Sequence, residues 1–348
     1  MTDSGIDTRP NRPATLHDVA REAGVSLATA SRSINGSTRK VNDEFRQRVL
    51  EAAARLDYSP NVSAQAMVRG TTTTVALLVA DISDPYFSSV AAGVIAEAES
   101  AALIVTMAVT DRDAERELDL VRALRGQRPR VMILAGSRPT ADTAESALGE
   151  ELRAYEGGGG VVVLIGRNEL DLRTVLVDNA GGAVALARAL TGIGYRRFGV
   201  LTGSEGLLAE IDRLEGFRAG LEASGGELRD DDIVRTAFTR DGGYDGMRRL
   251  LARGLAGVEL VFAASDIMAV GALSAIRDAG LTPGTDVAVA GFDDIPTTRD
   301  VTPPLTTVRV PLEALGRRAL RLALGDTDAA ARAVATEVVL RESTPARG

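Results

Sequence analysis

Residues 20–32 read AREAGVSLATASR, and this stretch decides how the N-terminal part of the chain folds. Ala20, Gly24 and Val25 place a small residue, a glycine and an apolar residue where two helices would pack steeply around a tight turn. This spacing predicts a helix-turn-helix unit, a motif that sets its second helix in the major groove of DNA. The pattern leaves one alternative open, a regulatory bundle of amphipathic helices that does not bind DNA.

Helix signals flank this stretch on both sides. Thr15 can cap a helix, and Asp18 three positions later completes a capping box. Ser26 and Asn42 can cap a second and a third helix, each followed by apolar residues at helical spacing. We therefore expect an all-α DNA-binding domain over residues 14–59.

The second of these helices offers a face for reading DNA. Arg32 can donate two parallel hydrogen bonds to a guanine edge, while Leu27 and Ala28 can lie against thymine methyl groups, with Thr29 on the same face. For His17, a solvated surface histidine is an equal alternative to a phosphate contact. Side chains with donors suited to phosphate oxygens are Thr15, His17, Ser26, Ser31 and Asn35.

The composition excludes several functions. The chain has no cysteine and a single histidine, His17, so disulfides, thiolate metal sites and histidine-based catalysis have almost nothing to build on, and we expect no cofactor. Residues 1–13 form a polar, disordered tail without a secretory signal, and no apolar run approaches the roughly 18 residues that span a bilayer. We expect a soluble cytoplasmic protein without a membrane partner.

The net charge of −8 is unevenly distributed. Residues 1–70 hold ten basic and eight acidic side chains, which leaves 30 basic and 40 acidic ones in the remainder of the chain. A mildly basic head before an acidic bulk suits a protein that contacts phosphate at one end only.

Strand-like and helix-like runs alternate in the rest of the chain. Unbroken apolar runs predict parallel strands that are buried on both faces, over residues 75–80, 103–108, 131–135, 161–165, 198–202, 260–264 and 287–291. Helices are expected between them, over residues 87–101, 114–125, 183–193, 212–223, 243–253 and 267–279. So many elements favour two similar α/β halves rather than one.

A family resemblance extends along nearly the whole chain, to about residue 341. The stretch TLHDVAREAGVSLATASRSINGSTRKVNDEFRQRVLEAAARLDYSPNVSAQAM, which begins at Thr15, resembles the signature of the lactose/galactose repressor family. Later landmarks are DISDPYF, VDNAGG, GYRRFGVLTG, RLEGF, ASD, GFDD and PPLTTV. The resemblance implies a periplasmic-binding-protein-like sensor of two Rossmann-like lobes with parallel sheets, over residues 75–341, with a tail over 342–348.

The resemblance also implies a hinge over residues 60–74 that becomes helical when two protomers bind an operator. In the family, a leucine from each hinge enters the minor groove and kinks the DNA, and Met67 stands at that position here. Arg39 and Ala64 join the expected DNA contacts. Without the resemblance, Met67 would read as ordinary linker.

The resemblance places a small-molecule effector in the cleft between the lobes. Arg213 and Asp293 would chelate hydroxyl groups, and the aromatic faces of Tyr86, Phe87 and Phe238 would pack on a sugar or a base. The alternative is that Arg213 and Asp293 form a salt bridge and the aromatics fill the core.

Two positions depart from many sugar-responsive relatives. Gly166 replaces an aspartate, and Ser265, which we count among the effector contacts, replaces an asparagine. Arg167 beside Gly166 would then supply a charged alternative. The acidic pair Asp293-Asp294 and the run over residues 230–232 could imitate a metal site, but the first falls at the ligand position and the second reads as a solvated loop.

We therefore predict a ligand-responsive transcriptional repressor, not an enzyme, that binds double-stranded, pseudo-palindromic operator DNA as a homodimer. The effector would be a sugar, a nucleoside or a small phosphorylated metabolite, and the sequence fixes neither its identity nor the sign of its effect. No leucine heptads follow residue 340, so a dimer is expected rather than a tetramer. One alternative is a global regulator with a protein coregulator. A second alternative is a solute-binding protein, although the helical N-terminal domain argues against it.

Overall fold

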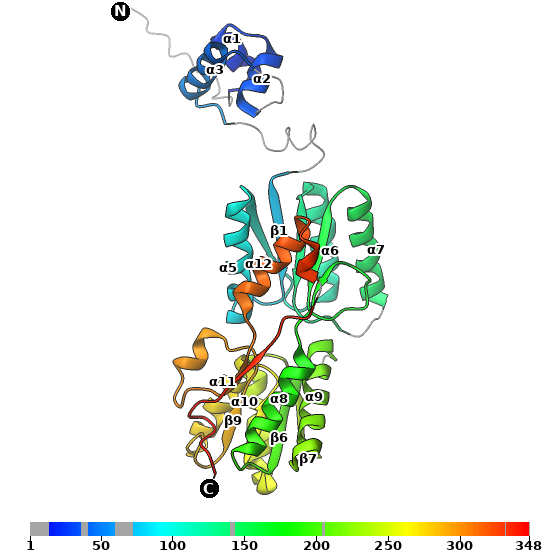
Figure 1. Cartoon of the computed structure of the whole chain (residues 1–348), viewed down its shortest axis with the longest axis vertical. Helices are drawn as coiled ribbons and strands as arrows, with labels where there is room; N and C mark the ends of the chain where they lie inside the picture. The colour runs from blue at the N-terminus through cyan, green and yellow to red at the C-terminus, as the bar shows by residue number, and fades with distance from the viewer. Residues whose placement is uncertain are drawn as a thin grey trace, which may run out of the picture. The chain divides into compact units, whose positions relative to one another are not determined.

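The computed structural model describes residues 14–35, 41–59, 72–139, 143–203, 206–330 and 332–347. The chain forms two compact units, Met1–Thr72 and Thr73–Gly348, each of which is described by itself below (Figure 1). None of the described helices is long and apolar enough to cross a membrane.

The first unit contains the three predicted helices, α1 (Leu16–Ala23), α2 (Leu27–Asn35) and α3 (Asp43–Arg55). The capping box of α1 is confirmed, because the backbone N–H of Thr15 donates to the Asp18 carboxylate at 3.0 Å and that of Asp18 donates back to Thr15 Oγ1. Gly24 ends α1 in the left-handed region, at φ 62°. The core of the unit consists of Val19, Ala20, Ala23, Ala30, Val49 and Ala52.

The first lobe of the second unit is a parallel sheet in the order β2-β1-β3-β4-β5. Helices α5 and α12 cover one face, where alternate β1 residues such as Leu77 are buried, and α6 and α7 cover the face that buries Leu78. The strands are β1 (Thr74–Val79), β2 (Ile104–Val109), β3 (Val131–Ala135), β4 (Val161–Ile165) and β5 (Thr174–Val175). The helices are α5 (Pro85–Ser100), α6 (Ala114–Gln127), α7 (Thr143–Gly157) and α12 (Leu312–Ala323).

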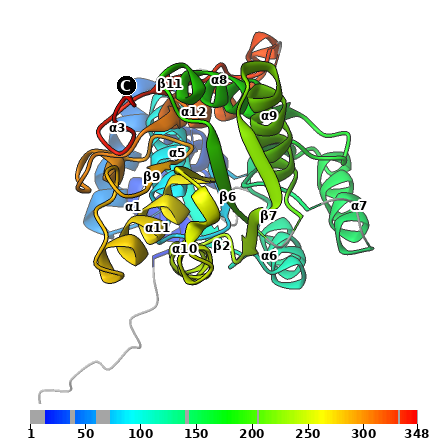
Figure 2. The same ribbon diagram turned by 90° about the horizontal axis from the view of Figure 1, so that it is seen from below.

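The second lobe is a parallel sheet in the order β7-β6-β8-β9, with α8 and α9 against one face and α10 and α11 against the other (Figure 2). The strands are β6 (Arg197–Gly203), β7 (Glu227–Thr236), β8 (Leu260–Ala263) and β9 (Ala288–Ala290). The helices are α8 (Asn179–Gly192), α9 (Leu208–Ser224), α10 (Arg240–Ala252) and α11 (Asp266–Asp278), and short 3-10 helices cover Leu255–Gly257, Pro296–Arg299 and Thr327–Ala330.

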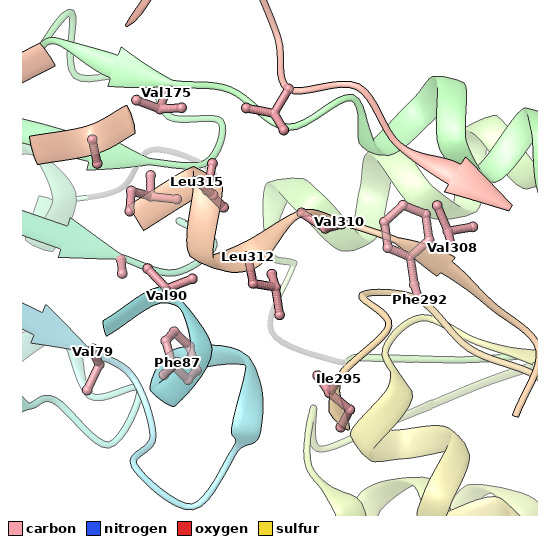
Figure 3. Close-up of a cluster of buried hydrophobic side chains, with 14 of the residues drawn as sticks. Val79, Phe87, Val90, Val175, Phe292, Ile295, Val308, Val310, Leu312 and Leu315 are labelled. Atoms are coloured by element: carbon pink, nitrogen blue, oxygen red, sulfur yellow. The ribbon is translucent and has the colours of Figure 1, made fainter. Parts of the chain in front are cut away.

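Three chain segments pass between the lobes. The first leads from β5 to α8, the second from β10 (Thr307–Arg309) to α12, and the third returns from α12 to β11 (Glu337–Val339). Strands β10 and β11 pair as a two-stranded antiparallel ribbon, which we call the interlobe ribbon. Around the second segment, side chains of both lobes share one apolar core, in which Val310 and Leu312 follow Val308 toward α12 and Phe292 lies beside Val308 (Figure 3).

The two α/β lobes with parallel sheets confirm the predicted fold class, but three details of the sequence interpretation were wrong. The expected tail beyond residue 341 belongs to the second lobe, since the Ser343 hydroxyl is fully buried, accepts from Thr306 N and donates to the Val289 carbonyl. Residues 230–232 lie in the edge strand β7 instead of a loop, and Asp232 is buried. Helices α7 and α12 were not predicted.

Candidate effector cleft and DNA-binding surface

A cleft of about 570 Å³ opens at the carboxyl ends of the parallel strands, lined by both lobes. The first lobe contributes the segments that follow β1, β2, β3 and β4, because the carboxyl ends of parallel strands meet at one sheet edge. The second lobe contributes the starts of α8 and α9 and the loops after β7 and β9. The lining residues are Asp84, Tyr86, Phe87, Arg112, Gly136, Ser137, Ile165, Gly166, Val177, Asn179, Ala209, Arg213, Phe238, Asp293 and Val310.

Arg213 and Asp293 form the buried polar centre of this cleft. The Arg213 guanidinium donates to both carboxylate oxygens of Asp293, at 2.7 and 3.3 Å, and through Nε to Asn179 Oδ1 at 2.9 Å. A fourth hydrogen bond runs to the Ala264 carbonyl at 2.6 Å, and the guanidinium lies 3.9 Å from the centroid of the Phe292 ring. The salt bridge considered as an alternative is therefore present, and both of its members line the cleft.

The pair retains capacity for a ligand. A guanidinium has five N–H groups, and four of those on Arg213 have acceptors among the described residues, which leaves one on Nη2. The Asp293 oxygens accept from Arg213 alone among the described side chains, so each has a lone pair for a further donor. The arrangement suits a hydroxyl group, which both donates and accepts.

Burial sets the ionisation of this centre. Loss of solvent raises the pKa of Asp293 to about 6, although the Arg213 guanidinium acts in the opposite direction. Burial also raises the pKa of the neighbouring Asp84 and of the Tyr86 phenol. Asp293 has φ 118°, a conformation that costs a non-glycine residue free energy and is typical of functional sites.

Aromatic rings form the walls of the cleft. Tyr86 and Phe87 lie in the first turn of α5 rather than in a loop, with their rings 5.0 Å apart in an edge-to-face arrangement. Phe238 lies in the loop after β7, and the Arg112 guanidinium lies 5.4 Å from its ring centroid and 5.9 Å from that of Phe87. Phe87 and Phe238 are both buried, so they serve as core and as cleft wall.

Two residues expected near the effector lie elsewhere. Ser265 is not among the lining residues, because its hydroxyl caps α11 by accepting from Met268 N. Arg167 pairs with Asp212 of the second lobe outside the cleft. Gly166 does line the cleft, and at φ 110° any side chain there would be strained.

The sequence interpretation also missed lining residues. Asp84 and Asn179 belong to the quoted motifs DISDPYF and VDNAGG, so the motifs themselves could have identified them. Arg112 follows β2 in a stretch without any such signal, in a chain with many arginines. Ser137 contacts the second lobe, since its Oγ accepts from Ala209 N at 2.9 Å.

A second cavity of about 880 Å³ adjoins the cleft and shares Arg112, Gly136 and Ser137 with it. It contains a buried ion cluster in which Arg138 binds Glu145 at 2.7 and 3.0 Å and Glu117 at 2.7 and 2.8 Å. The cluster joins the segment after β3 to α6 and α7, and it is best explained as a structural support for that edge of the cleft.

In the first unit, α2 exposes the residues expected to read bases. Leu27, Ala28 and Arg32 are exposed, and Leu27 keeps 40% of its surface accessible. Thr29 and Ser31 are half-buried on the same helix. Of the expected phosphate contacts, His17 and Ser26 are exposed and Thr15 is half-buried, while Asn35 is the last residue of α2. Arg39, Ala64 and Met67 lie outside the described residues.

Comparison with known proteins identifies the family. Residues 15–61 match the model of the bacterial regulatory proteins of the lacI family, and residues 187–344 match that of the periplasmic binding protein-like domain. The chain is 34% identical to the HTH-type transcriptional regulator GalS of Salmonella typhimurium over 312 residues, 89% of each protein.

Solved structures agree with this assignment. A complex of the transcriptional regulator CelR with cellobiose is 31% identical, with a TM-score of 0.67 over 95% of this chain and 99% of that one. The lac repressor dimer bound to operator and the anti-inducer ONPF has the same fold, with a TM-score of 0.80 at 23% identity over 96% of this chain and 100% of that one. The chain therefore belongs to the lactose/galactose repressor family of DNA-binding transcriptional regulators, and it is not an enzyme.

Proposed function

We propose that this regulator is a cytoplasmic repressor that binds a pseudo-palindromic operator as a homodimer and responds to a small polyhydroxylated effector, a sugar or a nucleoside, held between its lobes. The observation that carries this proposal is the buried Arg213–Asp293 pair at the centre of a cleft with aromatic walls. A relative named as a ribose operon repressor, and a regulator bound to cellobiose, support the sugar class.

The proposed recognition combines directed and undirected contacts. A ligand hydroxyl would accept from the remaining Arg213 N–H and donate to Asp293, and these bonds are strong because the charges are shielded from water. The rings of Phe87 and Phe238 would pack on the apolar face of a sugar or on a base. The other polar side chains of the lining, Asp84, Arg112, Ser137 and Asn179, could recognise further groups of the effector.

The proposed response is a change in the angle between the lobes. An effector that contacts both lobes favours one arrangement by its differential affinity, and in a dimer that change alters the spacing of the two DNA-binding units. The half-sites would then lie about 34–36 Å apart or a multiple of that distance. Coupling is reciprocal, so operator DNA must change effector affinity by the factor by which effector changes operator affinity.

The proposed DNA contacts divide into two groups. The major-groove group would read base edges through Arg32, Leu27 and Ala28 of α2. The minor-groove group is the hinge over residues 60–74, from which Met67 would insert between base pairs. Hydroxyl and imidazole side chains around α1 and α2 would bind phosphates and set the register.

The experiment that tests this function is an operator selection with the full-length protein against random duplex DNA, followed by fluorescence anisotropy across salt. An enriched palindrome, bound by two protomers, would support the proposal, and the same probe would screen sugars and nucleosides for release or tightening. Failure to enrich any sequence, with cell extract added as well as without it, would contradict it. Enrichment only with extract would favour a regulator that needs a coregulator.

A further inference from the structure

The acidic residues Asp293 and Asp294 are neighbours in the chain but face different parts of the molecule. Asp293 binds Arg213 in the cleft, whereas the Asp294 carboxylate accepts from Arg309 Nε at 2.8 Å and from Arg341 Nη2 at 2.6 Å. A third donor is Thr298 Oγ1 at 3.0 Å, and only 1% of the Asp294 side chain is exposed. Burial alone would raise the pKa of Asp294, but these donors hold it below its ordinary value.

One of the two arginines lies in the interlobe ribbon, and the other lies just beyond it in the chain. Arg309 ends β10, which leads into α12 of the first lobe, and Arg341 follows β11, which returns from it. Arg309 also pairs with Glu337 of β11 at 3.0 Å. A single buried carboxylate therefore binds the end of β10 and the segment that follows β11.

The backbone of Asp293 is attached to the same ribbon. Its N–H donates to the Val308 carbonyl at 2.8 Å, and Val310 N donates to its carbonyl at 3.2 Å. Asp293 and Asp294 both have positive φ, 118° and 55°, so these contacts hold the segment in a conformation that non-glycine residues rarely adopt. A backbone shift of Asp293 would therefore disturb Asp294 or the ribbon.

We propose that Asp294 is the positioning residue that couples the effector cleft to the interlobe ribbon and so fixes the angle between the lobes. This inference rests on the proposed function in one respect, because it takes Asp293 to be an effector contact. An effector that draws Asp293 toward itself would pull Asp294, and with it Arg309 at the end of β10 and Arg341 just after β11. Without these ion pairs, the lobes sample further angles.

The test measures the distance between the lobes in the full-length protein by pulsed electron spin resonance. The chain has no cysteine, so Glu115→Cys on α6 and Asp245→Cys on α10, both exposed, take spin labels at two defined sites. Labelled protein is diluted into unlabelled protein so that one protomer reports. We expect one distance population in the parent and a second or shifted population after Asp294→Asn.

Two variants keep the result interpretable. Asp232→Asn makes the same change at a buried aspartate that pairs with Arg229 inside the second lobe, and it should leave the distances unchanged. Arg309→Gln removes the ion pair between Asp294 and β10, while Arg341 still neutralises Asp294. This variant should shift the distances even if Asp294→Asn does not fold.

Unchanged distances in Arg309→Gln and in folded Asp294→Asn would overturn the inference, and so would an equal change in Asp232→Asn, which would indicate general loosening. The measurement requires neither operator nor effector, so its failure is separate from a failure of the proposed function.

Discussion

The guanidinium of Arg112 lies 5.4 Å from the ring centroid of Phe238, so a cation of the first lobe meets an aromatic ring of the second at the boundary of the cleft. Arg112 also lies over Phe87 and within 3.9 Å of the Asp84 carboxylate. A cation–π contact of this kind is directional but weak, about 0.5–2 kcal/mol. A contact this weak would yield to the change in lobe angle that we propose.

Phe238→Ala should weaken effector binding about tenfold, because it removes an aromatic wall worth about 1–2 kcal/mol and releases Arg112. Operator affinity without effector should stay within twofold. Isothermal titration with an effector from the operator-release screen measures the first quantity, and Phe238→Leu is the control for size. Unchanged effector affinity in both variants would show that the ring serves only the core.

Asp293→Ala should abolish the effector response while operator binding persists, because the carboxylate is the principal acceptor in the cleft. Anisotropy of the labelled operator, with and without effector, measures both quantities. Asp293→Asn, which keeps one oxygen for Arg213, is the matched variant. Should operator affinity collapse in both, Asp293 is a structural residue and the proposed effector site is wrong.

The raised pKa of Asp293 makes a signed prediction about stability. An acid whose folded-state pKa is about 6 binds more protons in the folded than in the unfolded chain between about pH 4 and pH 6. Its contribution to the free energy of unfolding therefore falls as pH rises through this window, by up to about 3 kcal/mol.

Urea unfolding of the parent and of Asp293→Asn at pH 4, 5, 6 and 7 tests this sign. The stability of the parent relative to the variant should decrease as pH rises, since the asparagine does not titrate. A relative stability that instead increases with pH would mean that the Arg213 charge outweighs burial and depresses the pKa.

Arg32→Ala should weaken binding to the selected operator by about 1–3 kcal/mol with little effect on random DNA, if the side chain reads a base. Specific and random duplexes are compared by anisotropy at fixed salt. His17→Ala in α1, at a proposed phosphate contact, should weaken binding to both duplexes equally. Equal losses for Arg32→Ala on both duplexes would reassign Arg32 to the phosphate backbone.

Gly316→Ala should lower the free energy of unfolding by at least about 1–3 kcal/mol, the usual cost of overpacking. Helices α5 and α12 cross so closely that a Cβ on Gly316 would lie 2.1 Å from the Val90 carbonyl oxygen, and one on Gly93 would lie 2.0 Å from that of Glu313. Gly126→Ala in α6, where nothing lies within 4 Å, is the control and should be neutral or slightly stabilising. Equal stability of the two variants would contradict this packing.

The capped helices of the first unit and the buried strands of the second unit were predictable because single local signals determine them. The expected strand over residues 131–135 coincides with β3, since an apolar run that is buried on both faces has no competing interpretation. Strand β7 was not predictable in this way, because an edge strand carries charges such as those over residues 230–232. Helix α12 shows a clear apolar face in Leu312, Leu315 and Ala319, and attention to that spacing would have found it.

The cleft was predictable only where a motif marks it. Arg213 and Asp293, which lie 80 residues apart in sequence, both line the cleft and form the salt bridge that was the alternative interpretation, while their contact with an effector stays a prediction. Ser265 caps α11 and is absent from the cleft lining, and local sequence cannot distinguish a serine cap from an effector contact. Arg112 is defined by contacts with Phe87 and Phe238, which only the tertiary structure brings together.

The crossing of the chain between the lobes has a consequence for the order in which the protein is made. The first lobe lacks a helix until residues 312–323 have left the ribosome, and the second lobe lacks Ser343, Thr344 and the β11 strand until later still. Domains generally fold as units as they emerge. The DNA-binding unit is therefore complete while both lobes are unfinished, and nascent chains would expose the part of the first sheet that α12 covers until that helix emerges.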